Sequence, residues 1–265
     1  MTSLLAVDVG NSATKIGRFE GEALRFHEII PTAESNEKKV GPALRRALRG
    51  MGKSGPARVE IALCSVVPAA ATVWRKAVRE AKAQLFVIQG DTPAPLANRY
   101  RFPAELGPDR LAAAVAAAAL HRPVIVVSLG TATTIDAVSA KGEFLGGAIC
   151  PGIAISLEAL AIATAMLPSV SPRKPLIAIG KDTQECLLAG SYFGTIGQVN
   201  EIIRRQREIV GPAVVVVAGG YADMVAGEIE GGAAVEDHLT LEGIRLIWQH
   251  NKIPARSRGR KAGGA

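Results

Sequence analysis

Short apolar runs alternate with amphipathic stretches along most of the chain, a pattern typical of α/β proteins. The apolar runs are short, and turn residues such as Gly10-Asn11 and Glu20-Gly21 separate the first of them, so we predict strands there. In the first half, the predicted strands are 4–9, 14–19, 24–30, 58–65 and 85–88, and the predicted helices are 41–50, 68–81 and 109–120. The last of these helices is rich in Ala and has no polar face, so we expect it to be buried between two halves of the molecule.

The second half of the chain repeats this order. An apolar strand at Val124–Val127 leads into a glycine-centred turn and a second strand, as at the N-terminus. Further helices are predicted at 152–165, 185–209 and 239–248, with a strand at 214–218. We therefore predict a duplicated α/β fold. Its domains are residues 1–118 and 119–253, followed by a basic, disordered tail at 254–265.

The turn after the first strand carries the chemistry of a phosphate-binding hairpin. Residues 8–15 combine a carboxylate, a glycine, small hydrogen-bonding side chains and a lysine, and differ from both the Walker and the Rossmann spacing. Backbone N–H groups of such a turn can bind an anion, and a carboxylate can orient hydrated Mg²⁺. The predicted ATP-binding residues here are Asp8, Gly10, Asn11, Ser12 and Lys15. A plain turn is the alternative, because Asp, Gly and Asn are also common turn residues.

Two later segments support the phosphate-binding interpretation. Ser128 to Thr134 repeats the strand, glycine turn and hydroxyl side chains, and it places Thr131 in a second phosphate loop. The strand at 214–218 ends in Gly219-Gly220, a pair that could let a nucleotide lie against the backbone. A glycine turn between strand and helix is the alternative for this pair. Two such hairpins predict a nucleotide held in a cleft between the two domains.

Composition narrows the classes of protein. The apolar runs fall short of the ~20 residues that span a bilayer, and no signal peptide is visible, so we expect no membrane segment. The net charge is +7, but Arg256, Arg258, Arg260 and Lys261 lie in the predicted tail and leave +3 for the rest. We therefore expect no nucleic-acid partner. The three cysteines are odd in number and widely spaced, which favours reduced thiols in a cytoplasmic protein without a cysteine metal site.

Motifs from end to end resemble the type III pantothenate kinases, a family that also includes the Bvg accessory factor proteins. The family pattern N-x-Y followed by G-x-D-R is matched by Asn98, Tyr100, Gly107, Asp109 and Arg110. Further matches are Gly130–Thr134, Gly146–Gly152, Leu167-Pro168, Ile179–Thr183 and Leu239–Gly243. The similarity runs from about residue 4 to about residue 250, which is nearly the whole chain.

This resemblance implies a fold, an activity and partners. The fold would be two duplicated RNase H-like domains of the acetate kinase, sugar kinase and actin superfamily. The activity would be ATP- and Mg²⁺-dependent phosphorylation of pantothenate to 4′-phosphopantothenate, the first step of coenzyme A biosynthesis, in a cytoplasmic homodimer. A different sugar or acid substrate on the same scaffold is disfavoured by the intact Tyr100, Gly107, Asp109 and Arg110.

The same resemblance assigns roles to individual residues. Asp109 would be the catalytic base that accepts the proton of the substrate hydroxyl, although an Asp at a helix start is also a common N-cap. Arg110 would pair with the substrate carboxylate and Tyr100 would bind a substrate amide or hydroxyl. A surface salt bridge and partial core packing are the respective alternatives. The full predicted substrate site is Tyr100, Gly107, Pro108, Asp109, Arg110 and Thr183, the last reached across the dimer interface.

One position departs from the family pattern. Its second loop usually begins with an Asp that binds an activating monovalent cation, K⁺ or NH₄⁺, and this chain has Ser128 there. A hydroxyl lacks the negative charge, so we expect weaker cation binding or none; Lys141 or Lys181 could substitute for the cation. This departure keeps open an alternative function, a kinase-impaired family member that acts as a regulatory or accessory binding protein. Lys15 could likewise be an ordinary strand residue facing solvent.

Overall fold

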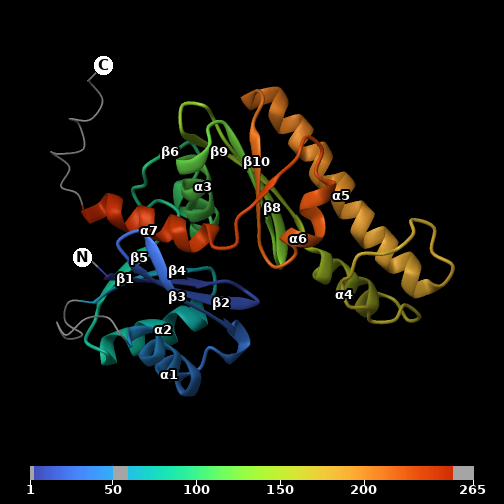
Figure 1. Cartoon of the computed structure of the whole chain (residues 1–265). Helices are drawn as coiled ribbons and strands as arrows, with labels where there is room; N and C mark the ends of the chain where they lie inside the picture. Colours follow the sequence, from blue (N-terminus) through green and yellow to red (C-terminus); the bar gives the residue numbers. More distant parts are fainter. Residues whose placement is uncertain (1–2, 50–58, 253–265) are drawn as a thin grey trace. The chain divides into compact units, whose positions relative to one another are not determined.

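A computed structural model describes residues 3–49 and 59–252 of the chain. They form two compact units, shown in Figure 1. The first unit takes in the described residues up to Ala116 together with the closing segment from Leu239, and the second unit is Ala117–His238. The predicted basic tail, 254–265, lies outside the described residues.

The first unit is built on a sheet with the strand order β3-β2-β1-β4-β5. The strands are β1 (Ser3–Val9), β2 (Ala13–Glu20), β3 (Ala23–Pro31), β4 (Glu60–Ser65) and β5 (Gln84–Ile88). The helices are α1 (Glu37–Leu48), α2 (Pro68–Glu80) and α7 (Leu239–Lys252), with a short 3-10 helix η1 (Thr32–Glu34) after β3. The three N-terminal strands pair antiparallel, whereas β4 and β5 extend the sheet in parallel from β1.

Side chains alternate across this sheet and so define two covered faces. Leu5, Val7 and Val9 of β1 join α1 and α2 in one apolar core, in which Trp74 is the largest fully buried side chain. The other face is packed against α7, whose Leu241 lies against Gly17 of β2. Alternation places Asp8 of β1 on this α7 face rather than in the α1–α2 core.

Helix α1 begins earlier than the sequence predicts, at Glu37 instead of residue 41. The Asn36 side chain accepts a hydrogen bond from the Lys38 N–H and caps the helix. Pro42 then lies inside the helix, although a proline more often marks a helix boundary. The cap sets the start, and the burial of Val40, Ala43, Leu44 and Ala47 holds the helix on the sheet.

The second unit repeats the topology of the first. Its strands run β11-β10-β7-β8-β9, with β7, β8 and β9 antiparallel and β10 and β11 parallel to β7. Its elements are β7 (Val124–Leu129), β8 (Ala132–Val138), β9 (Glu143–Pro151), α4 (Ile153–Ala163), α5 (Thr183–Val210), β10 (Val214–Ala218), α6 (Ala222–Val225), η4 (Ala226–Glu228) and β11 (Ala234–Val235). Both units have the same strand order and the same pattern of parallel and antiparallel pairs. The predicted duplicated α/β fold is therefore confirmed.

The segment that joins the two units carries β6 (Ala97–Asn98), η3 (Pro103–Glu105) and α3 (Pro108–Leu120). Residues Leu111–Ala118 of α3 are buried, as its lack of a polar face predicts. The division of the chain differs from the predicted boundaries at the C-terminus. We placed residues up to 253 in the second domain, whereas α7 packs on β1 and β4 and belongs to the first unit. Among the described residues, no helix is both long and apolar enough to cross a bilayer.

Candidate functional site

The turn between β1 and β2 is held by a residue from the end of β3. The Gly10 N–H donates to the Ala13 carbonyl at 3.1 Å, and the Thr32 hydroxyl donates to the Gly10 carbonyl at 2.7 Å. The Thr32 N–H donates to the Ser12 carbonyl at 2.9 Å. These bonds fix the backbone of the turn, and Asn11 and Ser12 at its tip are exposed. A rigid turn with exposed polar groups suits the binding of a small anion.

Asp8 has the most strongly perturbed surroundings of the predicted site residues. Its Cα pairs with that of Lys15 in β2 and that of Cys64 in β4, and the residue is only 7% exposed. Burial raises the pKa of the Asp8 carboxyl to about 7, while Lys15 lowers it and the negative charge of Asp109 raises it further. Burial, together with Asp8 and Asp109, also raises the pKa of the Cys64 thiol. A buried carboxyl with a pKa near 7 marks a candidate functional site, and a positive partner would favour its charged form.

The second hairpin, between β7 and β8, is the counterpart of the first. The Gly130 N–H donates to the Ala132 carbonyl at 3.1 Å, and the Gly152 N–H donates to the Thr131 carbonyl at 3.1 Å. Ser128 lies one residue before the last residue of β7, as Asp8 does in β1. Ser128 pairs with Thr134 across the hairpin and with Ala218 of β10. The topology therefore makes Ser128 the equivalent of Asp8, with a neutral hydroxyl in place of the carboxylate.

The glycine pair that follows β10 packs directly on this second hairpin. Gly219 has φ +105°, and a Cβ there would lie 2.3 Å from the Leu129 carbonyl oxygen, so only glycine fits. The Tyr221 N–H donates to the same carbonyl at 3.3 Å. Gly220 is exposed and has open space beside it. The second unit thus places Thr131 and the glycine pair in the turns that follow the neighbouring strands β7 and β10.

The segment from Asn98 to Leu106 is organised around Gly90, which follows β5. The Asn98 side chain donates to the Gly90 carbonyl at 3.0 Å and accepts from the Tyr100 N–H at 2.9 Å. Gly90 is buried, and a Cβ there would lie 2.1 Å from the carbonyl oxygen of Leu106. The loop is therefore fixed at both ends, at Tyr100 and at the residue before Gly107.

Asp109 and Arg110 lie in the first turn of α3. The Leu111 N–H donates to the Gly107 carbonyl at 3.1 Å, and the Asp109 carboxylate accepts from the Arg110 N–H at 2.8 Å. A Cβ at Gly107 would lie 2.6 Å from that carboxylate, so the glycine leaves room for it. The guanidinium of Arg110 is centred 5.6 Å from the Tyr100 ring, and the residue is 8% exposed. The structure thus brings the predicted base, the predicted carboxylate partner and the predicted phenol together in the first unit.

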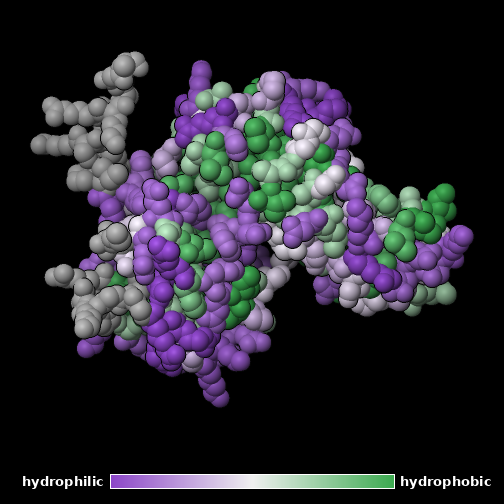
Figure 2. All heavy atoms as spheres, viewed as in Figure 1, coloured by the Kyte–Doolittle hydropathy of each residue, from purple (hydrophilic) through white to green (hydrophobic). Residues whose placement is uncertain are grey.

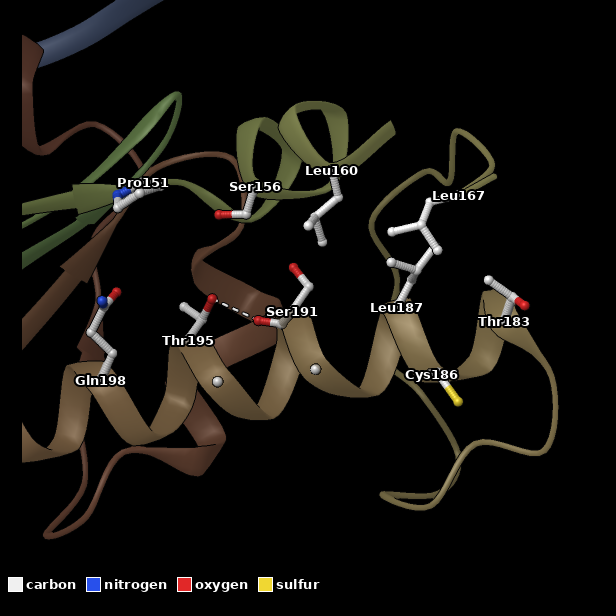
Figure 3. A pocket seen from close by; sticks show the side chains of 12 residues that line it. Pro151, Ser156, Leu160, Leu167, Thr183, Cys186, Leu187, Ser191, Thr195 and Gln198 are labelled. Carbon is white, nitrogen blue, oxygen red and sulfur yellow. Dashed lines mark hydrogen bonds between the residues drawn. The ribbon is translucent and has the colours of Figure 1, made fainter. Parts of the chain in front are cut away.

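Thr183 lies elsewhere, in the second unit, as the first residue of α5. Figure 3 shows it at one end of a groove between α4 and α5, with Leu187, Ser191, Thr195 and Gln198 along the same helix. The groove has a volume of about 500 Å³ and is mostly apolar, with Leu160 and Leu167 on its other side. The Asp182 side chain caps the helix by accepting from the Glu185 N–H at 2.8 Å. A contact of Thr183 with the substrate stays a prediction.

Sequence reasoning missed two residues that build the site. Thr32 holds the first hairpin, and Gly90 holds the loop before Asp109. Both lie far along the chain from the motif they support, and neither belongs to a motif of its own. The only available signal was Asn98, whose match to the family pattern is explained by its bonds to Gly90 and Tyr100.

Comparisons with known proteins agree with this geometry. The family model for type III pantothenate kinase matches residues 4–205. A type III pantothenate kinase of Anaeromyxobacter dehalogenans is 41% identical over 253 residues, covering 94% of this chain and 100% of the relative.

Solved structures show the same fold at low identity. A Baf family protein from Campylobacter jejuni has a TM-score of 0.60 at 19% identity, covering 94% of this chain and 98% of its own. A glucomannokinase from Arthrobacter that uses ATP or inorganic polyphosphate has a TM-score of 0.50 at 13% identity, covering 94% and 100%. With its family motifs in place on the corresponding hairpins and helix, the chain belongs to the type III pantothenate kinase family.

Proposed function

We propose that this protein transfers the γ-phosphoryl group of ATP to the primary hydroxyl of pantothenate, which forms 4′-phosphopantothenate and ADP in coenzyme A biosynthesis. One observation carries the proposal beyond family membership. Asp109, Arg110 and Tyr100 meet at the start of α3, and the charge of Asp109 reaches Asp8 at the phosphate hairpin. The proposed base, Asp109, is therefore close enough to the proposed phosphate site for its charge to affect Asp8. We also propose that the protein works in the cytoplasm.

In this mechanism Asp109 orients the substrate hydroxyl and accepts its proton as the oxygen attacks the γ-phosphorus. The new P–O bond forms while the bond between the γ-phosphorus and the bridging oxygen breaks, and ADP carries that oxygen away. The first turn of α3 supports an anionic side chain, because the helix dipole is positive at its N-terminus. The 2.8 Å bond from the Arg110 N–H also fixes the carboxylate.

Arg110 suits a substrate carboxylate. Its planar guanidinium can form two parallel hydrogen bonds with a carboxylate, and it lies over the Tyr100 ring, which limits its motion. Because Arg110 is 8% exposed, a carboxylate bound there would be shielded from competing water. Gly107 and Pro108 form the backbone entry to this helix turn and complete the proposed substrate site in the first unit.

The two hairpins would bind the nucleotide. In the first unit, Gly10, Asn11, Ser12 and Lys15 supply backbone N–H groups, polar side chains and one positive charge. In the second unit, Thr131, Gly219 and Gly220 supply a hydroxyl and an open backbone beside it. We propose that they hold the phosphates and flank the adenosine, respectively.

The residues present fit a magnesium ion bound through water. Among the described residues, no group of three or more His, Cys, Asp or Glu could hold a metal ion by itself. Mg²⁺ commonly takes one carboxylate together with waters and substrate phosphates, and Asp8 offers a buried carboxyl that gains from a positive neighbour. When bound, the ion would offset the charge of the phosphates. Ser128 could give a monovalent cation only a neutral oxygen.

We further propose that the active form is a homodimer that buries an apolar surface of the second unit. Exposed apolar side chains gather on α4 and on the segment between α4 and α5, where Figure 2 shows hydrophobic atoms at the surface. They are Ile155, Leu160, Ile162, Met166, Leu176, Ile177 and Ile179. Large exposed apolar patches usually mark association sites. Thr183 adjoins this surface, so a dimer could bring it to the partner's substrate site.

Replacement of the base tests the proposed function. Asp109→Asn should lower turnover by ~10²–10⁴-fold in a coupled assay of ADP release with pantothenate, because a positioned base contributes about that factor. ATP binding should change little. Glu105→Gln, an exposed acid in η3, is the matched control and should keep turnover. Turnover of Asp109→Asn within a few-fold of the wild type would remove Asp109 from this role.

Arg110→Ala should weaken pantothenate binding by at least ~10-fold, because a charged hydrogen bond contributes ~1.5–3 kcal/mol. Arg110→Lys should recover only part of this loss, since a lysine cannot form the planar pair of bonds. Titration calorimetry with pantothenate and with a non-hydrolysable ATP analogue measures both affinities, and the exposed Arg101→Ala is the control. A drop in nucleotide affinity alone would assign Arg110 to the phosphate site instead.

Asp8 should make the ligand-free protein less stable as pH rises. The carboxyl titrates near 3.8 when unfolded and near 7 when folded, so between these values the folded state binds the extra proton. Stability linked to Asp8 is therefore present at low pH and is lost as pH rises towards and through 7. Between pH 5 and pH 8 the free energy of unfolding of the wild type should therefore fall. Asp8→Asn should not show this fall, so its free energy of unfolding should gain about 2 kcal/mol relative to the wild type over that range. Urea unfolding at both pH values measures it, and parallel curves for the two proteins would refute the burial of a charged Asp8.

The wild type should respond weakly to K⁺, and Ser128→Asp should create or strengthen the response. A carboxylate would help hold a dehydrated cation beside the phosphates, where it offsets charge during transfer. Activity is measured against KCl, with choline chloride added to keep the ionic strength constant. Strong K⁺ activation of the wild type would show that other oxygens complete the site. No turnover by either protein with any cation would favour the accessory-protein alternative.

A further inference from the structure

At Gly243, helix α7 lies directly against the backbone of the helix that carries Asp109. A Cβ at Gly243 of α7 would lie 1.8 Å from the carbonyl oxygen of Ala112 and 2.4 Å from its carbonyl carbon. Ala112 is one helical turn beyond Asp109, and both it and Gly243 are buried. In Figure 1, α7 runs between α3 and the sheet of the first unit. Any side chain at position 243 must therefore push the two helices apart.

A second contact of the same kind lies on the other side of Asp109. A Cβ at Gly90 would lie 2.1 Å from the carbonyl oxygen of Leu106 and 2.5 Å from that of Pro103. Leu106 is three residues before Asp109, and its side chain is buried. Because the obstructing atoms are backbone atoms at both glycines, no side-chain rotation can relieve the overlap.

Helix α7 is itself firmly held on the sheet. Its Trp248 indole donates to the Glu60 carboxylate of β4 at 2.8 Å. The buried Arg245 pairs with Glu242, bonds Gln249 at 2.9 Å, and lies over the Phe19 ring of β2 at 5.8 Å. Strand β1, which carries Asp8, packs against the same helix. When α7 and α3 are forced apart, α3 is therefore the element that moves relative to Asp8.

We propose that Gly90 and Gly243 are positioning residues for the phosphoryl transfer. The two backbone contacts bracket Asp109, three residues before it and three residues after it, and so set where its carboxylate stands relative to the phosphate hairpin. The inference rests on the proposed kinase function and deepens it. It assigns a task to the closing Leu239–Gly243 motif, whose glycine lies far along the chain from the residues that contact substrate.

An overlap of this size at a backbone atom requires a displacement on the order of 1 Å, and a misplacement of about 1 Å can cost ~10²-fold in rate. Gly243→Ala and Gly90→Ala should each lower turnover by about that factor. The KM for ATP should stay within about 3-fold, because the contacts hold α3 rather than the nucleotide hairpins.

A matched control separates positioning from the general effect of an added methyl group. Gly41 lies inside α1 of the same unit, and a Cβ there would meet only the far end of the Arg45 side chain at 3.4 Å. Gly41→Ala should leave turnover unchanged. Thermal unfolding of all three variants shows which are folded at the assay temperature.

A double-mutant cycle with Asp109→Asn provides the readout that a merely structural role would not move. Once the base is gone, its displacement should no longer matter, so adding Gly243→Ala or Gly90→Ala should cost less than about 3-fold in turnover. If the glycine changes instead lower turnover by the same factor in both backgrounds, they act through overall stability, and the proposal is wrong.

The same experiments distinguish a failure of the positioning role from a failure of the proposed kinase function. Wild-type protein without pantothenate-dependent ADP release would overturn the kinase itself. An active wild type whose glycine variants fold and keep full turnover would overturn only the positioning role. Two variants guard against a single folding failure, and if neither folds, the glycines serve folding rather than positioning and the proposal fails. The proposal is supported if the glycine variants lose turnover but still bind ATP, and if the same changes have little effect in the Asp109→Asn background.

Discussion

The buried carboxyl of Asp8 is the constraint on which the first unit depends. It lies at the end of β1, on the α7 face of the sheet, and is 7% exposed. A charge there is costly without a partner, and Lys15 offsets only part of the cost while Asp109 adds to it. Two carboxyls in electrostatic contact need a cation or a proton between them. A magnesium ion bound there, as we propose, would relieve this repulsion.

The duplicated topology makes clear how the two hairpins differ. Asp8 and Ser128 occupy equivalent positions on β1 and β7, yet one carries an acidic group and the other a hydroxyl. The second hairpin compensates with backbone: Gly219 lies against the Leu129 carbonyl, and Gly220 is open. The hairpin of the first unit thus carries a charged group, whereas the hairpin of the second unit presents a neutral hydroxyl beside open backbone. The two hairpins therefore share one topology but differ in chemistry, because the equivalent position carries Asp8 in the first and Ser128 in the second.

Much of this could be read from the sequence, because the decisive residues are clustered in short motifs. The hairpins at Asp8 and Ser128 follow apolar strands, and their turn chemistry is local. The α1 start was missed because Asn36 caps the helix and Pro42 misleads. The closing helix was assigned to the second domain because chain order suggested it, whereas its apolar face packs on β1 and β4. Thr32 and Gly90 were missed for a common reason: their importance lies in what they touch, and a single sequence does not record contacts between distant segments.

The way Asp109 is held has a physical consequence for the fold. A side chain that is positioned by other side chains can be moved by repacking, since rotamers change at small cost. We propose that Asp109 is positioned instead by the backbones of Leu106 and Ala112, which lie against Gly90 and Gly243. The Ala112 carbonyl belongs to α3 and cannot rotate without breaking a helix hydrogen bond, so that contact is stiff. Stiffness at the base, combined with an exposed and polar turn at Asn11 and Ser12, divides the work of the first unit. If Asp109 is the base, the fixed part would set the geometry of proton removal, and the exposed part would meet the nucleotide.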